Sequence, residues 1–247
     1  MTERFSSAAP RFVRIVGAGA SPLDSMTLRV LYQLRNAAVM IRNRLDSTKV
    51  LDQILPQARR VYVGKAIGDR SVPQYGLHAL LVAHTRIGSR VVRLKGGDSY
   101  VSGRDRDEIQ ALRVQSIAFL VVPGVTAPSG CGHSIDAPQP CRQLCVFAAS
   151  FCARRCHVRL ASSGAARADA SFLHGCAASG ANCRAAVQPW VGIGTPAAVV
   201  RDGRRPIQMV IACSLRRLVQ MPPAYGPQHG LLIIGERACI SPKSYAD

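Results

Sequence analysis

The 247-residue chain is expected to fold as an α/β protein with two domains. Between residues 12 and 122, short apolar runs alternate with stretches of helical spacing, a pattern typical of a largely parallel sheet. The buried-strand pattern at 91–95 then ends in Gly96-Gly97-Asp98. Open α/β sheets bind their ligands beyond the carboxyl ends of the strands, so this corner is a candidate binding site. The alternative for these residues is an ordinary tight turn.

The elements of the first half follow from periodicity and from turn residues. Gly17-Ala18-Gly19 follows the first strand, but Pro22 occupies the position of the third glycine in a dinucleotide-binding motif, so that motif is weak here. Leu28, Leu31 and Leu34 have helical spacing. We expect strands at residues 12–16, 37–41, 61–65, 91–95 and 119–122, and helices at 27–36, at 73–85 and from 104 onward.

The second half of the chain is less regular. The Pro-Gly turn at 123–124 marks the expected boundary between domains 1–123 and 124–247. Strands are expected at 144–149, 207–212 and 231–236, and Asp202-Gly203 is a hairpin-type turn. Residues 150–170 show no clear period and remain unassigned.

The chain is strongly basic, with 32 Lys and Arg against 14 Asp and Glu and a net charge of +18. Nearly all of the positive charge is arginine, which binds carboxylate and phosphate in a two-pronged manner. One interpretation is a polyanionic partner, and the other is a codon bias that scatters arginine over the surface. Aromatic residues make up only 5% of the chain, which argues against a stacking platform for single-stranded nucleic acid.

The cysteines and the N-terminal sequence predict a cytoplasmic protein. No secretory signal precedes the nine cysteines, so they do not indicate a disulfide framework. Four of them form C-x3-C pairs at 141–145 and 152–156, a spacing unlike that of structural zinc sites, and we expect small apolar fillers and no metal. There is no apolar run of about 18 residues, the length that a spanning helix requires.

Residues 93–104 read R-L-K-G-G-D-S-Y-V-S-G-R and resemble the signature R-L-K-G-G-D-P-[FY]-[VI]-F-G-R of uroporphyrinogen-III C-methyltransferases, members of the tetrapyrrole methylase family. Ten of the twelve positions match. V-G-K at 63–65, P-G-V-T-A at 123–127, T-P-A-A-V-V at 195–200 and L-L-I-I-G-E at 231–236 also resemble family motifs. The resemblance covers most of residues 12–240.

The resemblance implies two α/β domains of the tetrapyrrole methylase type, with the cofactor cleft between them, in a homodimer. It further implies S-adenosylmethionine as the methyl donor. The implied reaction is C-methylation of uroporphyrinogen III to precorrin-2, on the route to cobalamin or sirohaem. An arginine-rich cleft suits this substrate, which carries eight carboxylates.

Matching the family motifs residue by residue implies the following site. Lys65 corresponds to the proton donor and Asn43 to the proton acceptor. The implied cofactor-binding residues are Ala20, Gly96, Gly97, Asp98, Val101, Thr126, Ala127, His174 and Gly203.

Several of these positions depart from the family pattern. Asn43 replaces an aspartate and cannot take up a proton, so we expect slower turnover without loss of activity. Ala20 replaces a proline and His174 a methionine, while Pro140 and Cys141 interrupt a further motif.

Three alternatives remain. The first is a methyltransferase acting on a later corrin precursor or on ribosomal RNA, although such relatives usually lack the R-L-K-G-G lead. The second is a basic nucleic-acid-binding protein with a relict fold. The third is a decayed, non-catalytic copy. The glycine turns of the family pattern are kept, whereas several of its side-chain contacts differ here. This combination favours a weak enzyme over an inactive one.

Overall fold

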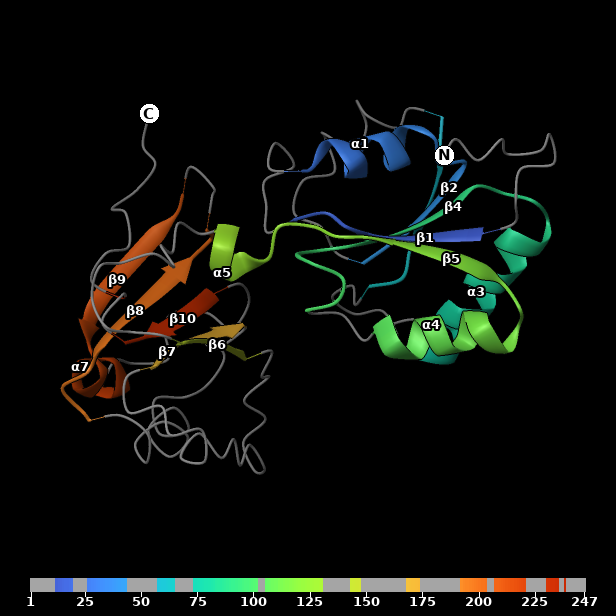
Figure 1. The fold of residues 1–247 in the computed structure, drawn as a ribbon. Coiled ribbons are helices and arrows are strands. Elements are labelled where there is room, and N and C mark those ends of the chain that lie inside the picture. The colour runs from blue at the N-terminus through green and yellow to red at the C-terminus, as the bar shows by residue number, and fades with distance from the viewer. Residues whose placement is uncertain are drawn as a thin grey trace. The chain divides into compact units, whose positions relative to one another are not determined.

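The structure is a computed structural model that describes residues 12–19, 26–43, 57–64, 73–101, 105–130, 143–147, 168–173, 192–203, 207–220, 230–235 and 238. The chain divides into two compact units, Met1–Thr126 and Ala127–Asp247. Each unit contains one five-stranded sheet (Figure 1). The predicted α/β class is therefore confirmed.

The sheet of the first unit is entirely parallel, with strand order β3-β2-β4-β1-β5. Its strands are β1 (Phe12–Gly17), β2 (Val39–Arg42), β3 (Arg59–Tyr62), β4 (Val91–Lys95) and β5 (Ala118–Val122). Parallel strands direct their carboxyl ends to the same edge, so the turns after β4, β1 and β5 are neighbours. This edge carries the candidate site.

Helices cover both faces of this sheet (Figure 1). Helix α1 (Leu28–Arg35) lies on one face, and α3 (Gln74–Arg86) and α4 (Asp105–Val114) lie on the other. Thr27 caps α1, because its hydroxyl accepts a hydrogen bond from the backbone N–H of Val30 at 3.3 Å. The described bounds agree with the predicted helices to within one residue at most ends.

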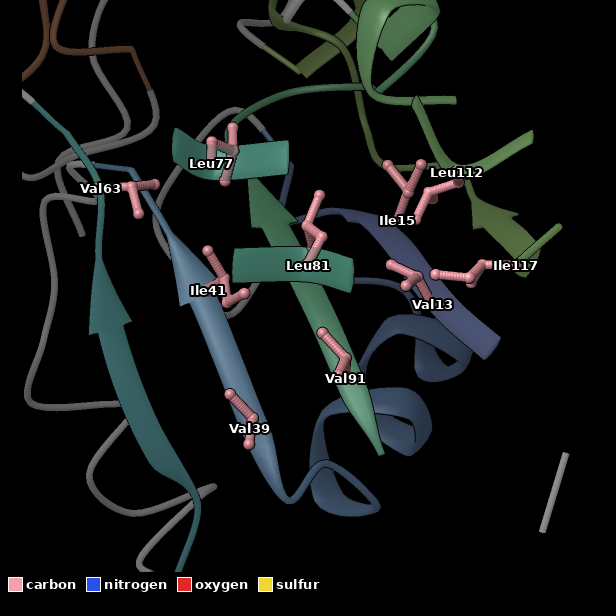
Figure 2. Close-up of a cluster of buried hydrophobic side chains, with 10 residues drawn as sticks. All are labelled: Val13, Ile15, Val39, Ile41, Val63, Leu77, Leu81, Val91, Leu112 and Ile117. Atoms are coloured by element: carbon pink, nitrogen blue, oxygen red, sulfur yellow. The ribbon is translucent and has the colours of Figure 1, made fainter. Parts of the chain in front are cut away.

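Successive side chains of the strands point to opposite faces of the sheet and form two separate hydrophobic clusters. Figure 2 shows the cluster under α3 and α4, to which Leu77 and Leu81 of α3 contribute. The strand residues of that cluster include Val13, Ile15, Val39, Ile41 and Val91. The intervening residues Val16, Met40, Val92 and Leu94 pack on the α1 face with Val30 and Leu34. This period of two places each side chain of β4 on a definite face.

Strand β3 differs from the sequence prediction, which placed a strand at 61–65. The observed strand begins two residues earlier and ends at Tyr62, and Arg59 and Arg60 are exposed. Its extent follows its parallel pairing with β2, from Val39 opposite Arg59 to Arg42 opposite Tyr62. An edge strand needs only one partner, so apolar residues are a poor guide to where it starts.

The second unit has strand order β6-β7-β10-β8-β9, with a parallel β6–β7 pair and antiparallel pairs elsewhere. Its elements are α5 (Ala127–Gly130), β6 (Gln143–Phe147), β7 (Ala168–Leu173), β8 (Pro196–Arg201), β9 (Met209–Ser214), α7 (Leu215–Gln220) and β10 (Gly230–Ile234).

Two features of this unit correct the sequence analysis. Strand β9 begins at Met209 rather than at 207. It pairs antiparallel with β8, and Asp202 takes a positive φ of 47° in the turn between the two strands. Strand β7 starts at Ala168, inside the segment left unassigned. Its sequence A-D-A-S-F-L has no β-branched residue, and its place between β6 and β10 compensates for that low propensity.

Candidate active site

The turns that follow β1 and β4 are joined by backbone hydrogen bonds. The N–H of Ala18 donates to the carbonyl of Lys95 at 2.7 Å. Gly19 and Gly97 exchange two bonds, of 3.1 Å from the Gly19 N–H and 2.7 Å from the Gly97 N–H. The loop after β4 is therefore held against the loop after β1 without any side chain between them.

Glycines occupy the points where three strand ends come closest. A Cβ on Gly17 would stand 2.6 Å from the Gly97 carbonyl oxygen and 2.8 Å from the Gly124 nitrogen. A Cβ on Gly124 would collide with the carbonyl oxygens of Gly17 and Gly97. Since the obstructing atoms are backbone, they cannot move aside, and only glycine fits at these two positions.

The carboxylate of Asp98 connects the loops that follow β4 and β5. Its Oδ2 accepts from the backbone N–H of Gly124 at 3.0 Å, and its Oδ1 accepts from the N–H of Tyr100 at 2.9 Å. The two bonds hold the turn at 98–100 closed and place Gly124 beside it. Asp98, expected to bind the cofactor, thus also has a positioning role.

The described residues leave the outer face of the corner bare. A Cβ added to Gly96 or to Gly97 would meet no atom of the described residues within 4 Å, and Gly97 has a φ of +68°. Gly96 is exposed. Among the described residues, this backbone is therefore open to a ligand, and the binding of a cofactor by Gly96 and Gly97 stays a prediction.

The other predicted site residues are distributed as follows. Val101 and Thr126 belong to the same unit as the corner, and Val101 is 37% exposed. Ala127 and Gly203 belong to the second unit. Lys65, Ala20 and His174 lie outside the described residues, as do Pro140 and Cys141.

A buried group of charges lies under the α4 face of β4. Glu108 of α4 accepts from Arg93 Nε through Oε1 at 3.3 Å, and its Oε2 lies 3.0 Å from Lys95 Nζ. All three side chains are no more than 4% exposed. A charge so far from water needs a partner, and the two β4 cations therefore require this carboxylate.

Asn43, which directly follows β2, is held by the same charged group. Arg93 donates from Nη2 to Oδ1 of Asn43 at 2.8 Å. Because a guanidinium has donors only, the amide oxygen must face Arg93 and the NH2 group must face away. Asn43 is exposed, so this NH2 group is presented to solvent.

Arg42, the residue before Asn43, stacks on an aromatic ring. Its guanidinium carbon lies 5.5 Å from the centroid of the Tyr62 ring on β3. Its Nε is buried and has no hydrogen-bond partner in the described part of the chain.

Sequence reasoning found residue 43 but missed Arg93, Glu108 and Arg42. The available signal was that Arg93 and Lys95 alternate with Val92 and Leu94 in a strand otherwise patterned for burial. Two charges on one face of a buried strand require an opposite charge from a helix packed on that face.

Comparison with known proteins identifies the family. Residues 13–219 match the profile of the Tetrapyrrole (Corrin/Porphyrin) Methylases. A siroheme synthase of Gluconacetobacter diazotrophicus is 34% identical over 230 residues, which are 91% of this chain and 49% of that protein. The chain thus spans about half the length of the curated relatives it matches.

Solved structures agree with this assignment. The uroporphyrin-III C-methyl transferase from Thermus thermophilus complexed with S-adenosyl homocysteine superposes with a TM-score of 0.78. It is 25% identical, and the match covers 93% of this chain and 99% of that one. A further structure of a uroporphyrin-III C-methyltransferase from Thermus thermophilus gives a TM-score of 0.74 at 28% identity, covering 95% and 99% of the two chains.

The described residues lack two further features. They contain no helix that is both long and apolar enough to cross a membrane. They also contain no group of three or more His, Cys, Asp or Glu side chains arranged to hold a metal ion.

The contact between the glycine turns predicts that two alanine substitutions differ in their effect on stability. Gly17→Ala should lower the free energy of unfolding by about 1–3 kcal/mol, because its methyl group would overlap backbone atoms. Gly96→Ala places the same group in open space and should change stability by no more than about 0.5 kcal/mol. Urea denaturation measures both, and equal midpoints would contradict the contact.

The buried charges around Glu108 predict a second difference in stability between two variants. Glu108→Gln leaves Arg93 and Lys95 without their buried carboxylate and should cost about 3–5 kcal/mol of stability. Asp107→Asn makes the same change at the exposed neighbouring position and should cost no more than about 0.5 kcal/mol. Thermal unfolding measures both variants, and coinciding midpoints would contradict the buried pairing of Glu108 with Arg93 and Lys95.

Proposed function

The chain belongs to the tetrapyrrole (corrin/porphyrin) methylases, and from this premise we propose that it methylates uroporphyrinogen III at two ring carbons, giving precorrin-2. The methyl donor in this proposal is S-adenosylmethionine. The observation that carries the proposal is the bare peptide corner at Gly96 and Gly97, where backbone is open to a ligand. Support also comes from the neighbour that holds S-adenosyl homocysteine.

The residues of the corner fit this cofactor. An S-adenosylmethionine sulfonium supplies an already activated methyl group, so the protein mainly has to hold the reacting carbon in line with it. Gly96 and Gly97 offer backbone without a Cβ, and Asp98 provides negative charge near a cationic ligand. Val101, Thr126, Ala127 and Gly203, with Ala20 and His174, complete the proposed cofactor contacts.

The charge of the chain supports the proposed substrate class. Uroporphyrinogen III carries eight carboxylates, and this chain has a net charge of +18 that is nearly all arginine. Guanidinium groups bind carboxylates through paired, charge-assisted hydrogen bonds. The relatives named siroheme synthase are consistent with a product on the route to sirohaem or cobalamin.

Methyl transfer leaves a proton to be removed. As the ring carbon forms its new bond to the methyl group, the S–CH3 bond breaks, and the positively charged ring must then lose a proton. In our proposal Lys65 assists the departure of that proton without being its final acceptor. Asn43 cannot accept it, because an amide is not a base and its oxygen is occupied by Arg93. The proton then passes to water, and turnover is slow.

Restoring the carboxylate tests this assignment. Asn43→Asp should raise the rate of precorrin-2 formation by about tenfold or more, in view of the usual contribution of a general base. The rate is followed by the absorbance of the methylated product after mixing the protein with S-adenosylmethionine and uroporphyrinogen III.

The same change at Asn36, an exposed residue at the end of α1, serves as the control and should leave the rate unaltered. If Asn43→Asp and Asn36→Asp behave alike, residue 43 takes no part in proton transfer. If the unaltered protein methylates no uroporphyrinogen III at all, the proposed function itself is wrong.

A further inference from the structure

We propose that the amino edge of the first unit's sheet, where its strands begin and its helices end, binds duplex DNA through the phosphate groups. In a parallel sheet this edge lies at the opposite end of the strands from the glycine corner. Five exposed arginines define it: Arg35, Arg59, Arg86, Arg90 and Arg113. The inference concerns a second surface and does not depend on the proposed function.

Three of the arginines end the helices that lead to this edge. Arg35 is the last residue of α1, Arg86 is the last of α3, and Arg113 is the last but one of α4. Each helix passes to the next strand through a turn of only three or four residues. Such short turns hold the three arginines close to the beginnings of the strands.

Hydrogen bonds and strand order bring the edge together. Arg90, immediately before β4, donates from Nε to the backbone carbonyl of Asn36 at 2.8 Å, which joins the start of β4 to the end of α1. Nη2 of Arg86 donates to Oε1 of Gln115 at 2.6 Å, so the ends of α3 and α4 are neighbours. Arg59 begins β3, two places from β4 in the sheet.

The dimensions of the edge suit a polymer with closely spaced charges. Adjacent strands are about 4.8 Å apart, so the five strands span about 19 Å. Duplex DNA carries one negative charge per about 1.7 Å of its axis, and an edge of this width therefore meets several phosphates at once. Guanidinium groups bind phosphate oxygens through two parallel N–H donors.

The described acids of this unit are confined to the other end of the sheet. They follow β4 or open α4, and they are Asp98, Asp105, Asp107 and Glu108. No described acid therefore weakens the positive potential of the amino edge. The helix dipole favours a basic residue at a helix end, but it does not account for Arg59 and Arg90, which stand where strands begin.

The positive charges at this edge lie close enough to repel one another. Burial lowers the pKa of Arg14 on β1, and the neighbouring charge of Arg90 lowers it further. A bound anion would relieve this repulsion between guanidinium groups.

Stacking of arginines on aromatic rings favours a duplex over a single strand. The guanidinium carbon of Arg14 lies 4.0 Å from the centroid of the Phe12 ring, and that of Arg113 lies 5.7 Å from the centroid of the Phe119 ring. Proteins that bind single strands offer free aromatic faces on which bases stack. Here two of the rings near the edge carry guanidinium groups, which contact phosphates without reading the base sequence.

Removing two of these charges tests the surface, and the same two helices supply the matched control. Arg35→Gln with Arg113→Gln removes charge from the ends of α1 and α4. Arg29→Gln with Arg106→Gln removes the same charge from exposed positions near their beginnings. The probe is a fluorescein-labelled DNA duplex of arbitrary sequence, and its Kd is measured by fluorescence anisotropy between about 50 and 200 mM NaCl.

The two double variants should differ in the salt dependence of DNA binding. Arg35→Gln with Arg113→Gln should raise Kd by about tenfold or more, and should lower the slope of log Kd against the logarithm of the salt concentration by about 2, because each lost phosphate contact removes about 1. Arg29→Gln with Arg106→Gln has the same net charge and should keep the slope of the unaltered protein.

Several results would overturn the surface. Equal slopes in the two double variants would mean that only the total charge of the chain attracts DNA. The surface is also overturned if the unaltered protein does not bind the duplex, or if polyglutamate or a single strand of the same length binds more tightly than the duplex.

Methylation of uroporphyrinogen III distinguishes this inference from the proposed function. The rate should be the same in the unaltered protein and in Arg35→Gln with Arg113→Gln, because neither arginine belongs to the proposed active site. If the unaltered protein binds DNA as expected but methylates no uroporphyrinogen III, the proposed function is wrong and the surface stands.

Discussion

Contact between bare backbones at Gly17, Gly97 and Gly124 is the constraint from which the rest of the site follows. Three neighbouring parallel strands end at one edge of the sheet, and their turns approach more closely than a Cβ would permit. Asp98 reinforces the contact by accepting the Gly124 N–H. Because the inner face of the β4 loop is fixed in this way, the described residues leave its outer face at Gly96 uncovered, as the proposed in-line methyl transfer requires.

The buried charges of Arg93, Lys95 and Glu108 also position a residue at the end of β2. Glu108 pairs with both cations of β4 and so connects α4 to the strand that carries the glycine corner. Arg93 then fixes the side chain of Asn43. In the proposed site, replacement of an acid at position 43 would make proton removal slower.

Much of the first unit could be predicted from the sequence, because buried parallel strands are short apolar runs and their order of helices and strands is regular. The glycine corner could be predicted too, since Gly96-Gly97-Asp98 follows such a strand directly. The pairing of Arg93 with Glu108 could not, because it joins residues fifteen positions apart through the packing of a helix on a strand. The close approach of Gly124 to Gly17 likewise depends on strand order. Strand β7 was missed because its residues have little strand propensity of their own.

Calorimetric titration with S-adenosylhomocysteine would examine the bare corner itself. The account predicts that the unaltered protein binds this product, and that Gly96→Val weakens binding by at least about tenfold, or 1.4 kcal/mol, while its thermal midpoint stays close to that of the unaltered protein. A Cβ at Gly96 would meet no atom of the described chain within 4 Å, and in the proposed site the added side chain would stand where the ligand lies. Equal affinities in the two proteins, or no binding to either, would contradict the account.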